Sequence, residues 1–598
     1  MMDLTIKEIA QACGGKLVVQ GGKADGDTCV TSVVIDSRAV EPGGVFIATV
    51  GERVDGHCFI RGAFAKGAVL AVTQKTPEEM GEAGGEAVGR KNADSVAQMD
   101  TKAPEELGEA KGEAAGRQNS DSVAQTVTKA PEEMGEAAAP AWGSYILVED
   151  TLQALKDIAE AYRKKLSVKV IGITGSVGKT STKEFIADVL AEKYKVLKTA
   201  GNFNNEIGVP LTLLRIRREH ELAVVEMGIS DFGEMRRLSK MARPNVCVIT
   251  NIGQSHLNNL KDRDGILRAK SEIFDYMSED GEICLNGEDD KLNGLEEIKG
   301  HKPHFFGLGS SSSQEVAAVD IVGRGLWGSD ATLMMAPGRT VWNGIKPGED
   351  TGALGAQPEK TPGMGGTKLA NTAEIDNAET DGTAKEAVWP GYHSFAVHVP
   401  QPGRHMVLNA AAAACVARLF GLTGEQIAAG IAKVAAVDGR THIISHPRHT
   451  IIDDCYNANP ASVKAALDLL ALADTRKVAI LGDMLNLGEN SHEYHAQIGR
   501  HAVEADIDTI LCVGEESRYM YQAAVEREEA GRAKADQAEK NHPAPQSRRI
   551  LHYLHRGALL EALAADSAFL IPKGSTILVK ASHDCGFSEI LAFLQAMG

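Results

Sequence analysis

Short apolar runs alternate with amphipathic stretches along most of this chain of 598 residues. The apolar runs end in Gly or polar residues, as in "VKVIGITG" (168–175) and "KVAILGDM" (477–484). Amphipathic stretches of helical period follow them, at residues 182–193, 460–472 and 492–504. This alternation is typical of parallel α/β sheets, which bind ligands beyond the carboxyl ends of their strands. We therefore expect functional side chains directly after the apolar runs, in more than one sheet.

A 27-residue repeat interrupts this pattern near the N-terminus, with units that begin at Lys75, Lys102 and Lys129. Each unit has a Pro, several Gly and many Glu, but few large apolar residues. Such a unit buries too little surface to offset the entropy lost on ordering. We expect a disordered or loosely helical insert over residues 75–139. A solenoid is the alternative, but it requires an apolar stripe that these units lack.

Two further segments break the alternation. Residues from about 335 to 387 mix Gly, Pro, Thr and acidic residues, and residues 526–549 are charged with Pro near the end. Both compositions are typical of surface loops that are expanded within a compact framework. We therefore predict loops in both places.

The formal charge of −18 at pH 7 excludes some functions. An acidic surface repels nucleic acid and anionic membranes, so an anionic substrate requires a local cluster of cations. Nine scattered cysteines without a CxxC pair are typical of reduced thiols in a cytosol. We find no secretory signal, and no apolar run reaches the ~18 residues of a membrane span. We expect a cytoplasmic protein without a membrane span that binds no nucleic acid.

The stretch "TGSVGKTST" (174–182) joins an apolar run to a helical pattern. Gly175 and Gly178 let backbone amides point into a concavity, and the following helix adds its positive N-terminal end. Lys179 can reach the outer phosphates of a nucleotide, and the Thr180 hydroxyl can join the coordination of Mg²⁺. A strict P-loop has Gly where this chain has Ile173, so an ordinary Gly-rich turn is the alternative. We predict that the phosphates of a nucleotide contact Thr174, Gly175, Ser176, Val177, Gly178, Lys179, Thr180 and Ser181.

A P-loop of this kind serves kinases, GTPases and ligases, and the surrounding motifs distinguish among them. They resemble the Mur ligases of peptidoglycan synthesis, and they occur in the order of that family: "DSRAVEPGGVFIATVGERVDGHCFI" (36–60), "NFNNEIGVPLTLL" (202–214), "VVEMG" (224–228), "NIGQSHL" (251–257) and "AKSEIF" (269–274). The most specific blocks are "DDCYNANPAS" (453–462) and "LGDMLNLG" (481–488). They are similar to the family members that add D-alanyl-D-alanine. The resemblance covers nearly the whole chain outside the inserts.

The resemblance implies an α/β protein of three domains. An N-terminal mixed α/β domain (1–166) would bind the UDP-sugar, a central P-loop ATPase domain (167–437) would bind ATP and Mg²⁺, and a C-terminal Rossmann-like domain (438–598) would hold the dipeptide. The implied activity is an ATP-dependent amide ligase that joins D-alanyl-D-alanine to UDP-N-acetylmuramoyl-tripeptide through an acyl phosphate. We expect a monomer whose domains close on one another during the reaction.

Candidate metal and catalytic residues follow the P-loop. Glu226 ends an apolar run, where a carboxylate can bind Mg²⁺, and His256 follows "NIGQS". A satisfied surface Glu and a loop His are the alternatives. By resemblance we hypothesise that Lys270 is carbamylated, which would turn a cation into an anionic oxygen ligand; a helix-surface lysine is the alternative. The predicted catalytic set is Lys179, His256 and Lys270, and the predicted metal ligands are Thr180, Glu226, His256 and Lys270.

The family pattern also implies nucleotide contacts far along the chain. His405 and Asn409 would lie near the nucleotide, with Asn409 at the adenine, although an alanine-rich helix could equally serve packing alone. Arg440 would reach the phosphates, since its planar fork can hold two phosphate oxygens. Asp454 would contact the ribose hydroxyls or nearby substrate.

Substrate contacts are implied in two regions. Asn459 belongs to a loop that the family assigns to amide formation, although it could simply cap the helix ahead of Pro460. His495 could lie near the dipeptide or simply on a helix face. In the N-terminal region Arg38 would supply positive charge for the UDP group, with Gly56 and His57 in the same loop. The predicted substrate contacts are Ser37, Arg38, Thr49, Gly51, Asp55, Asn457, Asn459, Pro460 and His495.

The chain departs from the family pattern at Cys455, Asn486 and Ala581. These departures affect the expected fit of the C-terminal pocket, but none of them removes a side chain that would bind phosphate or metal.

Three alternative functions stay open. One is another ligase of the superfamily, such as the one that adds the third stem residue or a folate polyglutamate synthase. The others are a catalytically silent P-loop module whose inserts dock partners, and a phosphotransferase. "DDCYNANP" argues against the first, and Glu226, His256 and Lys270 together argue against the silent module.

Overall fold

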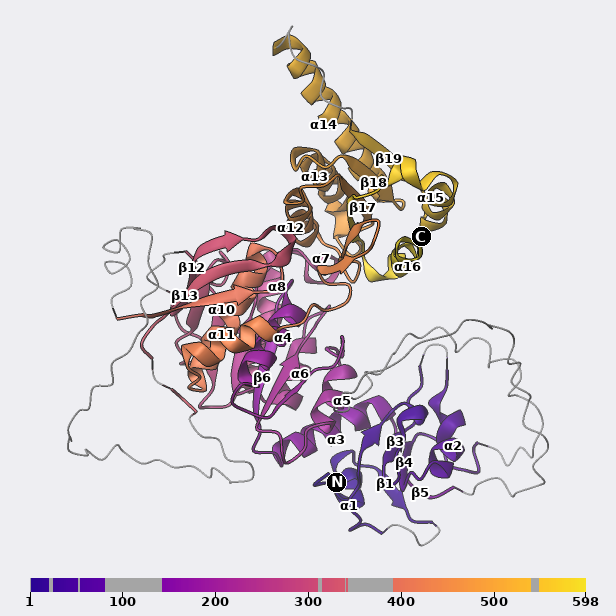
Figure 1. Cartoon of the computed structure of the whole chain (residues 1–598). Helices are drawn as coiled ribbons and strands as arrows, with labels where there is room; N and C mark the ends of the chain where they lie inside the picture. Colours follow the sequence, from indigo (N-terminus) through magenta and orange to yellow (C-terminus); the bar gives the residue numbers. More distant parts are fainter. Residues whose placement is uncertain are drawn as a thin grey trace, which may run out of the picture. The chain divides into compact units, whose positions relative to one another are not determined.

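The computed structural model describes residues 2–20, 25–51, 54–80, 142–309, 314–338, 340–342, 391–538 and 548–597. These residues form two compact units, Met1–Ala154 and Leu155–Gly598 (Figure 1). Most of the repeat insert predicted at 75–139 and most of the segment predicted at 335–387 lie outside the described residues. Within the ranges above, no helix has the length and apolar character needed to cross a membrane.

The N-terminal unit is built on a five-stranded sheet with the strand order β1-β5-β4-β3-β2. Its parallel strands are β2 (Val33–Val34), β3 (Val45–Ile47), β4 (Leu70–Thr73) and β5 (Ser144–Leu147), and β1 (Lys16–Val18) runs antiparallel to β5. Helix α1 (Ile6–Ala12) begins with a capping box between Thr5 and Glu8. Helix α2 (Ile60–Ala65) contributes buried side chains to the core of this unit. The mixed α/β character predicted for this part of the chain is confirmed.

The second unit holds two sheets, of which the first has nine strands in the order β14-β13-β12-β11-β10-β9-β6-β8-β7. The strands are β6 (Lys169–Thr174), β7 (Val196–Lys198), β8 (Leu222–Glu226), β9 (Val246–Ile249), β10 (Glu282–Asn286), β11 (His304–Leu308), β12 (Val316–Gly323), β13 (Ser329–Met335) and β14 (His393–Val399). The strands from β6 to β12 are parallel, and β13 and β14 extend the sheet in antiparallel fashion. The carboxyl ends of β6, β8 and β9 therefore meet at one edge.

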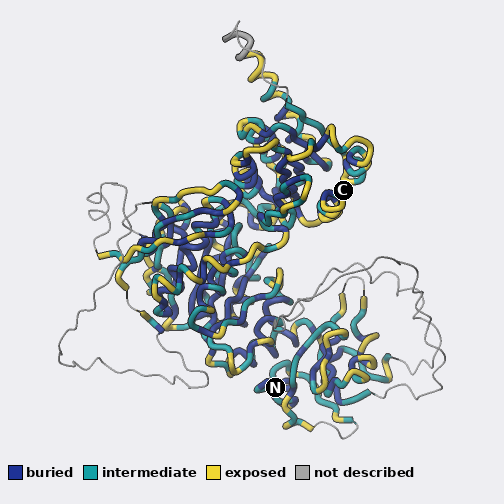
Figure 2. The backbone as a smooth tube through the Cα atoms, viewed as in Figure 1, coloured by how far each residue is buried: buried dark blue, intermediate teal, exposed yellow. Residues whose placement is uncertain are grey.

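Helices cover this sheet, and one of them is enclosed on all sides. They are α3 (Thr151–Lys164), α4 (Lys179–Leu190), α5 (Gly208–Leu214), α6 (Glu234–Ala242), α7 (Leu257–Leu260), α8 (Arg263–Ser271), α10 (Arg404–Leu419) and α11 (Gly424–Lys433). The alanines of α10 from Ala410 to Ala414 are at most 1% exposed. Their small side chains let α10 pack closely on α4 and on the sheet, within the dark blue interior of Figure 2.

The last sheet has six strands in the order β15-β16-β20-β17-β18-β19. Its strands are β15 (His442–Ser445), β16 (Thr450–Asp453), β17 (Lys477–Gly482), β18 (Thr509–Val513), β19 (Arg549–Tyr553) and β20 (Thr576–Lys580). All are parallel except β15, which runs antiparallel to β16. Its helices are α12 (Pro460–Ala471), α13 (Ser491–Glu504), α14 (Ser517–Ala538), α15 (Arg556–Leu570) and α16 (Ser588–Ala596). Three sheets, each with its helices, confirm the predicted α/β class.

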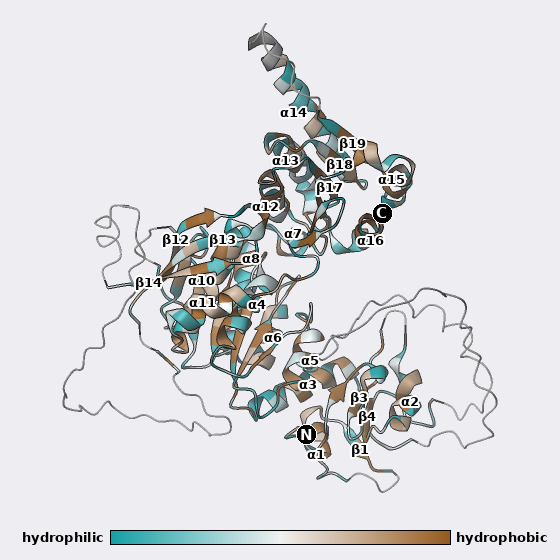
Figure 3. Ribbon diagram, in the orientation of Figure 1, coloured by the Kyte–Doolittle hydropathy of each residue, from teal (hydrophilic) through white to brown (hydrophobic). Residues whose placement is uncertain are grey.

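Helix α14 corrects the loop predicted at residues 526–549, because the helix continues to Ala538. The sequence there is rich in Glu, Ala, Arg and Lys, which are strong helix formers. An ion pair of 3.2 Å between Glu528 and Arg532, one turn apart, adds to the helix. Hydrophilic residues follow one another along this part of α14 (Figure 3). The charged composition of this segment therefore did not distinguish a solvent-exposed helix from a loop.

Candidate active site

The loop between β6 and α4 has the shape of a phosphate cradle. Gly175 follows β6 with a φ of +151°, and a Cβ atom there would lie 1.9 Å from the Thr250 hydroxyl. Gly178 has a φ of +84° and stands directly before the first residue of α4, Lys179. Only glycine fits the first position, and the second favours it strongly. The backbone therefore approaches the space in front of the N-terminal end of α4, where an anion is stabilised.

This cradle is held rigidly by the segment that follows β9. The Val177 amide donates a hydrogen bond of 2.9 Å to the Asn251 side-chain oxygen. The Thr250 hydroxyl donates to the Val177 carbonyl at 2.6 Å. The Gly253 amide in turn donates to the Ser176 hydroxyl at 2.9 Å. These bonds fix the loop in one conformation, which lowers the cost of binding a phosphate group.

A buried carboxylate faces the first turn of α4. Glu226, at the end of β8, is 0% exposed. Its Oε1 atom accepts hydrogen bonds from the Thr180 hydroxyl at 3.1 Å and from the Asn204 side-chain amide at 2.8 Å. Its Oε2 atom has no hydrogen-bond partner among the described residues, and the nearest cation is Lys183 Nζ at 4.0 Å. A buried carboxylate oxygen without a partner is costly unless a cation meets it.

Two lysines and a histidine lie close to this carboxylate and the P-loop. Burial lowers the pKa of Lys179, which the charge of Glu226 partly offsets and that of Arg440 reinforces. Burial and the charge of Lys179 hold the pKa of Lys270 well below its usual value. Burial lowers the pKa of His256 to about 4, with contributions from the charges of Lys270 and Lys179. The predicted catalytic residues are therefore near neighbours, in surroundings that disfavour their protonated forms.

The site fits a hard divalent cation together with phosphate oxygens. Among the described residues, no group of three His, Cys, Asp or Glu side chains could hold a metal on its own. Thr180 and the unpartnered oxygen of Glu226 are oxygen ligands of the kind that Mg²⁺ prefers, and Mg²⁺ usually takes its remaining ligands from phosphates and water. The structure therefore supports the part of the predicted metal set that lies on α4 and β8.

The other predicted nucleotide residues lie around the same cradle. Asn409 on α10 accepts a hydrogen bond of 3.1 Å from the Thr182 hydroxyl and lies beside Gly178. Thr174 is fully buried, and its hydroxyl has no partner in the described part of the chain. Ser181 lies half-buried in the first turn of α4. Burial lowers the pKa of His405, whose environment includes Asp454 and Lys580 from the last sheet.

Arg440 and Asp454 belong to the carboxyl edge of the last sheet. The Arg440 guanidinium lies 4.0 Å from the centre of the Tyr456 ring. The Asp454 carboxylate accepts a hydrogen bond of 2.6 Å from Lys580 Nζ and one of 3.1 Å from the Thr441 amide. Both oxygens of Asp454 therefore have partners within the protein. The predicted contact between Asp454 and a ribose stays a prediction.

The "YNANP" turn begins α12. The Asn459 side chain accepts a hydrogen bond of 3.0 Å from the Ser462 amide and caps the helix, with Pro460 as the first helical residue. Asn457 is exposed, and its side chain accepts a hydrogen bond from the Ala458 amide at 2.9 Å. Asn459 thus has the capping geometry considered from the sequence, whereas Asn457 presents its side chain to solvent.

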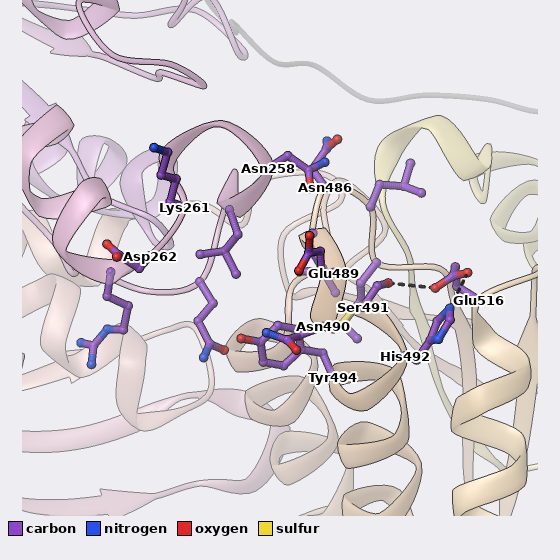
Figure 4. Close-up of a pocket in the computed structure, with 17 residues that line it drawn as sticks. Asn258, Lys261, Asp262, Asn486, Glu489, Asn490, Ser491, His492, Tyr494 and Glu516 are labelled. Carbon is purple, nitrogen blue, oxygen red and sulfur yellow. Dashed lines mark hydrogen bonds and ion pairs between the residues drawn. The ribbon is translucent and has the colours of Figure 1, made fainter.

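A pocket of about 1150 Å³ lies in the second unit (Figure 4). It is lined by residues that follow β9, including Asn258 and Lys261, and by the loop that follows β17, including Asn486 and Glu489. His495 supports this loop through two hydrogen bonds. Its Nε2 atom accepts one of 3.0 Å from the Met484 amide, and its Nδ1 atom donates one of 2.8 Å to the Ser491 carbonyl. Both ring nitrogens have partners, so His495 shapes the pocket wall and does not line the pocket.

In the N-terminal unit, the predicted UDP residues lie in two short helices and a turn. Ser37 and Arg38 belong to the 3-10 helix η1 (Ser37–Ala39), where Arg38 is 64% exposed and pairs with Asp36 at 2.8 Å. The Gly51 amide donates to the Val54 carbonyl at 3.0 Å, and the Gly56 amide donates to the Thr49 carbonyl at 2.9 Å. These bonds close the turn that carries Asp55.

Asp55 organises this turn with two basic partners. It contacts His57 Nδ1 at 2.5 Å and Lys75 Nζ at 2.8 Å. Burial alone would raise the pKa of Asp55, but the hydrogen bonds from Lys75 and His57 lower it to about 2. Lys75 was placed in the repeat insert from the sequence, and here it is part of the folded unit.

Comparison with known proteins assigns the chain to a family. Three family models match in order: "Mur ligase family, catalytic domain" at residues 30–163, "Mur ligase middle domain" at 173–340 and "Mur ligase, glutamate ligase domain" at 439–583. A protein of Treponema pallidum named UDP-N-acetylmuramoyl-tripeptide--D-alanyl-D-alanine ligase is 30% identical over 523 residues, which are 86% of this chain and 87% of the relative. The chain belongs to the Mur ligase family.

Other relatives extend the match over the full length of this Mur ligase. A Bacillus subtilis protein of the same name is 28% identical over 594 residues, 99% of this chain and 98% of its own. A crystal structure of MurF from Acinetobacter baumannii has a TM-score of 0.68 at 25% identity, over 99% of this chain and 98% of that one. A structure of MurF ligase from Thermotoga maritima in complex with ADP shares the fold, with a TM-score of 0.62 at 22% identity over 95% of this chain and 97% of that one.

Several residues of this site were not recognised from the sequence. Asn204 donates to Glu226, and it lies in a motif that was quoted only for its resemblance. Lys183 and Lys580 are 1% and 2% exposed, and each satisfies several carbonyl or carboxylate oxygens. A lysine at the end of an apolar strand, as Lys580 is, was the available signal, but the sequence alone does not distinguish a buried lysine there from an exposed one.

The Asp55 cluster predicts a pH-dependent contribution to stability. Because folding lowers its pKa to about 2, the contribution is present above the unfolded pKa of about 3.9 and is lost as the pH falls toward 2. Replacement by Asn should cost about 1 kcal/mol at pH 7 after allowance for solvent screening. Hydrogen exchange of residues 54–75 in full-length Asp55→Asn measures this cost.

The difference from wild type should narrow as the pH falls from about 5 toward 2, because the carboxylate of the unfolded chain takes up its proton before that of the folded protein. Asp27→Asn, at an exposed aspartate of the same unit, is the matched control and should have no effect. A difference at Asp55 that does not change with pH would contradict this account.

Proposed function

We propose that this chain is an ATP-dependent amide ligase that joins D-alanyl-D-alanine to UDP-N-acetylmuramoyl-tripeptide, with ADP and phosphate as the other products. The observation that carries the proposal is the P-loop Lys179 beside the buried carboxylate Glu226, in a chain that matches relatives of that name over nearly its whole length. ATP and Mg²⁺ are the proposed cofactors. We further propose that the enzyme acts in the cytoplasm as a monomer.

The chemistry requires activation of a carboxylate. An amine cannot displace oxide from a carboxylate, so the terminal carboxylate of the tripeptide first attacks the γ-phosphorus of ATP and ADP leaves. The dipeptide amine then attacks the carbonyl carbon of the acyl phosphate, loses a proton and expels inorganic phosphate as the amide forms. Both steps depend mainly on alignment of the reactants and on stabilisation of negative charge.

The residues of the cradle supply that stabilisation. Lys179 and the amides at the start of α4 face the developing charge on the phosphates, and Arg440 adds a further positive charge from the last sheet. Thr180 and Glu226 would hold Mg²⁺, which neutralises phosphate charge when it is bound. His256 has a neutral ring at pH 7 because its pKa is about 4, so it is available as a ligand or hydrogen-bond partner.

Lys270 fits the proposed carbamate for a physical reason. Burial and the charge of Lys179 favour its neutral amine, which is the form that reacts with carbon dioxide. The reaction forms an N–C bond, releases one proton and leaves an anionic carboxylate on the nitrogen. That anion would replace repulsion between Lys270 and Lys179 by attraction. The carbamate therefore relieves an unfavourable interaction of the unmodified side chain.

The remaining site residues are proposed from their places in the fold. The pocket of Figure 4 has room for a small ligand such as the dipeptide, beside the loop that His495 supports. Asn457, Asn459, Pro460 and His495 are the proposed substrate contacts of the last sheet. Ser37, Arg38, Thr49, Gly51 and Asp55 are the proposed contacts of the UDP group. The domain boundaries at 166/167 and 437/438 are proposed from the resemblance to the family.

The direct test is phosphate release by the purified protein with ATP, Mg²⁺ and UDP-N-acetylmuramoyl-tripeptide. We expect release only when D-alanyl-D-alanine is present, together with the amide product. A phosphotransferase would instead give a stable phosphorylated product without the dipeptide, and a silent binding module would give neither. Phosphate release that is independent of the dipeptide would contradict the proposal.

Lys270→Ala tests the carbamate. We expect activity to fall by about 100-fold or more, since a charged group in the catalytic site is removed, and short carboxylates such as acetate should restore part of it. Labelled bicarbonate should add a carbamate signal to wild type that Lys270→Ala lacks. Lys240→Ala, at an exposed lysine of α6, is the control and should behave as wild type. Full activity of Lys270→Ala without added carboxylate would refute this role.

A further inference from the structure

Lys580 is a buried lysine whose hydrogen bonds are all made inside the protein. It ends β20 and is 2% exposed. Its Nζ atom donates to Asp454 Oδ2 at 2.6 Å, to the Asn457 carbonyl at 3.0 Å and to the Asp454 carbonyl at 3.4 Å. An ammonium group has three N–H donors, and here each has an acceptor. Lys580 therefore acts on the loop after β16 and has no free donor for a ligand.

The partner of Lys580 in turn holds the turn before β15. Asp454 Oδ1 accepts the Thr441 amide at 3.1 Å, and Asp453 Oδ2 accepts the Gly439 amide at 2.9 Å. Thr441 has a φ of +55°, which is strained for a β-branched residue. Such a conformation persists only where its surroundings fix it. Two adjacent carboxylates thus fix the three residues from Gly439 to Thr441.

Arg440 is the middle residue of this turn. Its guanidinium lies over the Tyr456 ring at 4.0 Å from the ring centre. In the described part of the chain, no carboxylate forms an ion pair with it, although Asp453 and Asp454 hold the amides on either side. Its charge acts on Lys179 of the P-loop. Arg440 is therefore fixed in place with its positive charge uncompensated, as a phosphate contact requires.

We propose that Lys580 is a positioning residue for Arg440. By holding the Asp454 carboxylate, Lys580 fixes the turn that presents the arginine and prevents that carboxylate from pairing with the guanidinium. The lysine thus keeps the positive charge of Arg440 available to a nucleotide phosphate. This inference deepens the proposed function and rests on it for the contact between Arg440 and the nucleotide.

The charge balance explains why a lysine is needed at this position. A neutral side chain at residue 580 would leave the Asp454 carboxylate, which is 13% exposed, without its ion pair. Arg440 lies next to Thr441, whose amide Asp454 already holds, so the guanidinium is a cation with which the carboxylate could pair instead. Such an ion pair would compete directly with phosphate binding. Because this effect acts through Arg440, removal of Lys580 should matter little in a protein that already lacks Arg440.

The test is calorimetric titration of ADP with Mg²⁺ into full-length variants. Lys580→Met should weaken ADP binding at least about tenfold, as expected when one partner of a buried charge pair is removed. Arg440→Ala should weaken ADP binding as well, and Lys580→Met should add less than about threefold to that loss in the Arg440→Ala background, because residues that act through one another are not additive. Lys477→Met, at the opposite edge of the same sheet, should leave ADP affinity unchanged.

Two results would overturn the inference: wild-type affinity in Lys580→Met, or a full tenfold further loss when Lys580→Met is added to Arg440→Ala. A loss of packing alone predicts the second result, since it does not depend on Arg440. If Lys580→Met does not fold, Lys580→Gln, which keeps an N–H donor for the Asn457 carbonyl, takes its place in both comparisons. A wild-type protein that binds ADP but makes no amide would refute the proposed function and leave this test intact.

Discussion

The proposed nucleotide site depends on basic side chains that are held away from water at the carboxyl edge of the nine-stranded sheet. Lys179, Lys270 and His256 lie near one another, and the buried carboxylate of Glu226 faces them. The protonated forms of these groups repel one another strongly in such surroundings because water screens their charges poorly. We propose that a polyphosphate with its metal ion relieves this repulsion. The chain as a whole carries −18, so this local cluster of basic groups would select where an anionic substrate binds.

The topology of the sheets explains how distant residues reach this place. Parallel strands end at the same edge, so the P-loop after β6, Glu226 on β8 and the Thr250–Asn251 segment after β9 meet without long connections. The last sheet contributes its own carboxyl edge, with Asp453, Asp454 and Lys580 on neighbouring strands. The contribution to nucleotide binding that we propose for it is one arginine, Arg440, held on a strained turn. A defect in the support of that turn should therefore affect the nucleotide site.

Much of the fold and part of the candidate site could be predicted from the sequence, because strand ends and glycine positions leave clear local patterns. The P-loop, the α/β class and the family assignment all followed from such patterns. The hydrogen-bond and ion-pair partners of individual side chains could not be predicted in this way. The hydrogen bonds of Asp454 to Lys580 and to the Thr441 amide were not anticipated, nor was the support that His495 gives to a loop through both ring nitrogens. Such roles depend on contacts between residues far apart in sequence, which no local spacing reveals.

The central claim is that the γ-phosphate held by the cradle passes to a carboxylate before the amide forms. Tripeptide labelled with heavy oxygen in its terminal carboxylate tests this claim directly by mass analysis of the released phosphate. The account predicts that each phosphate released with the amide carries one labelled oxygen, because the bridging oxygen of the acyl phosphate leaves with the phosphorus. Unlabelled phosphate, formed at the same rate as the amide, would contradict it.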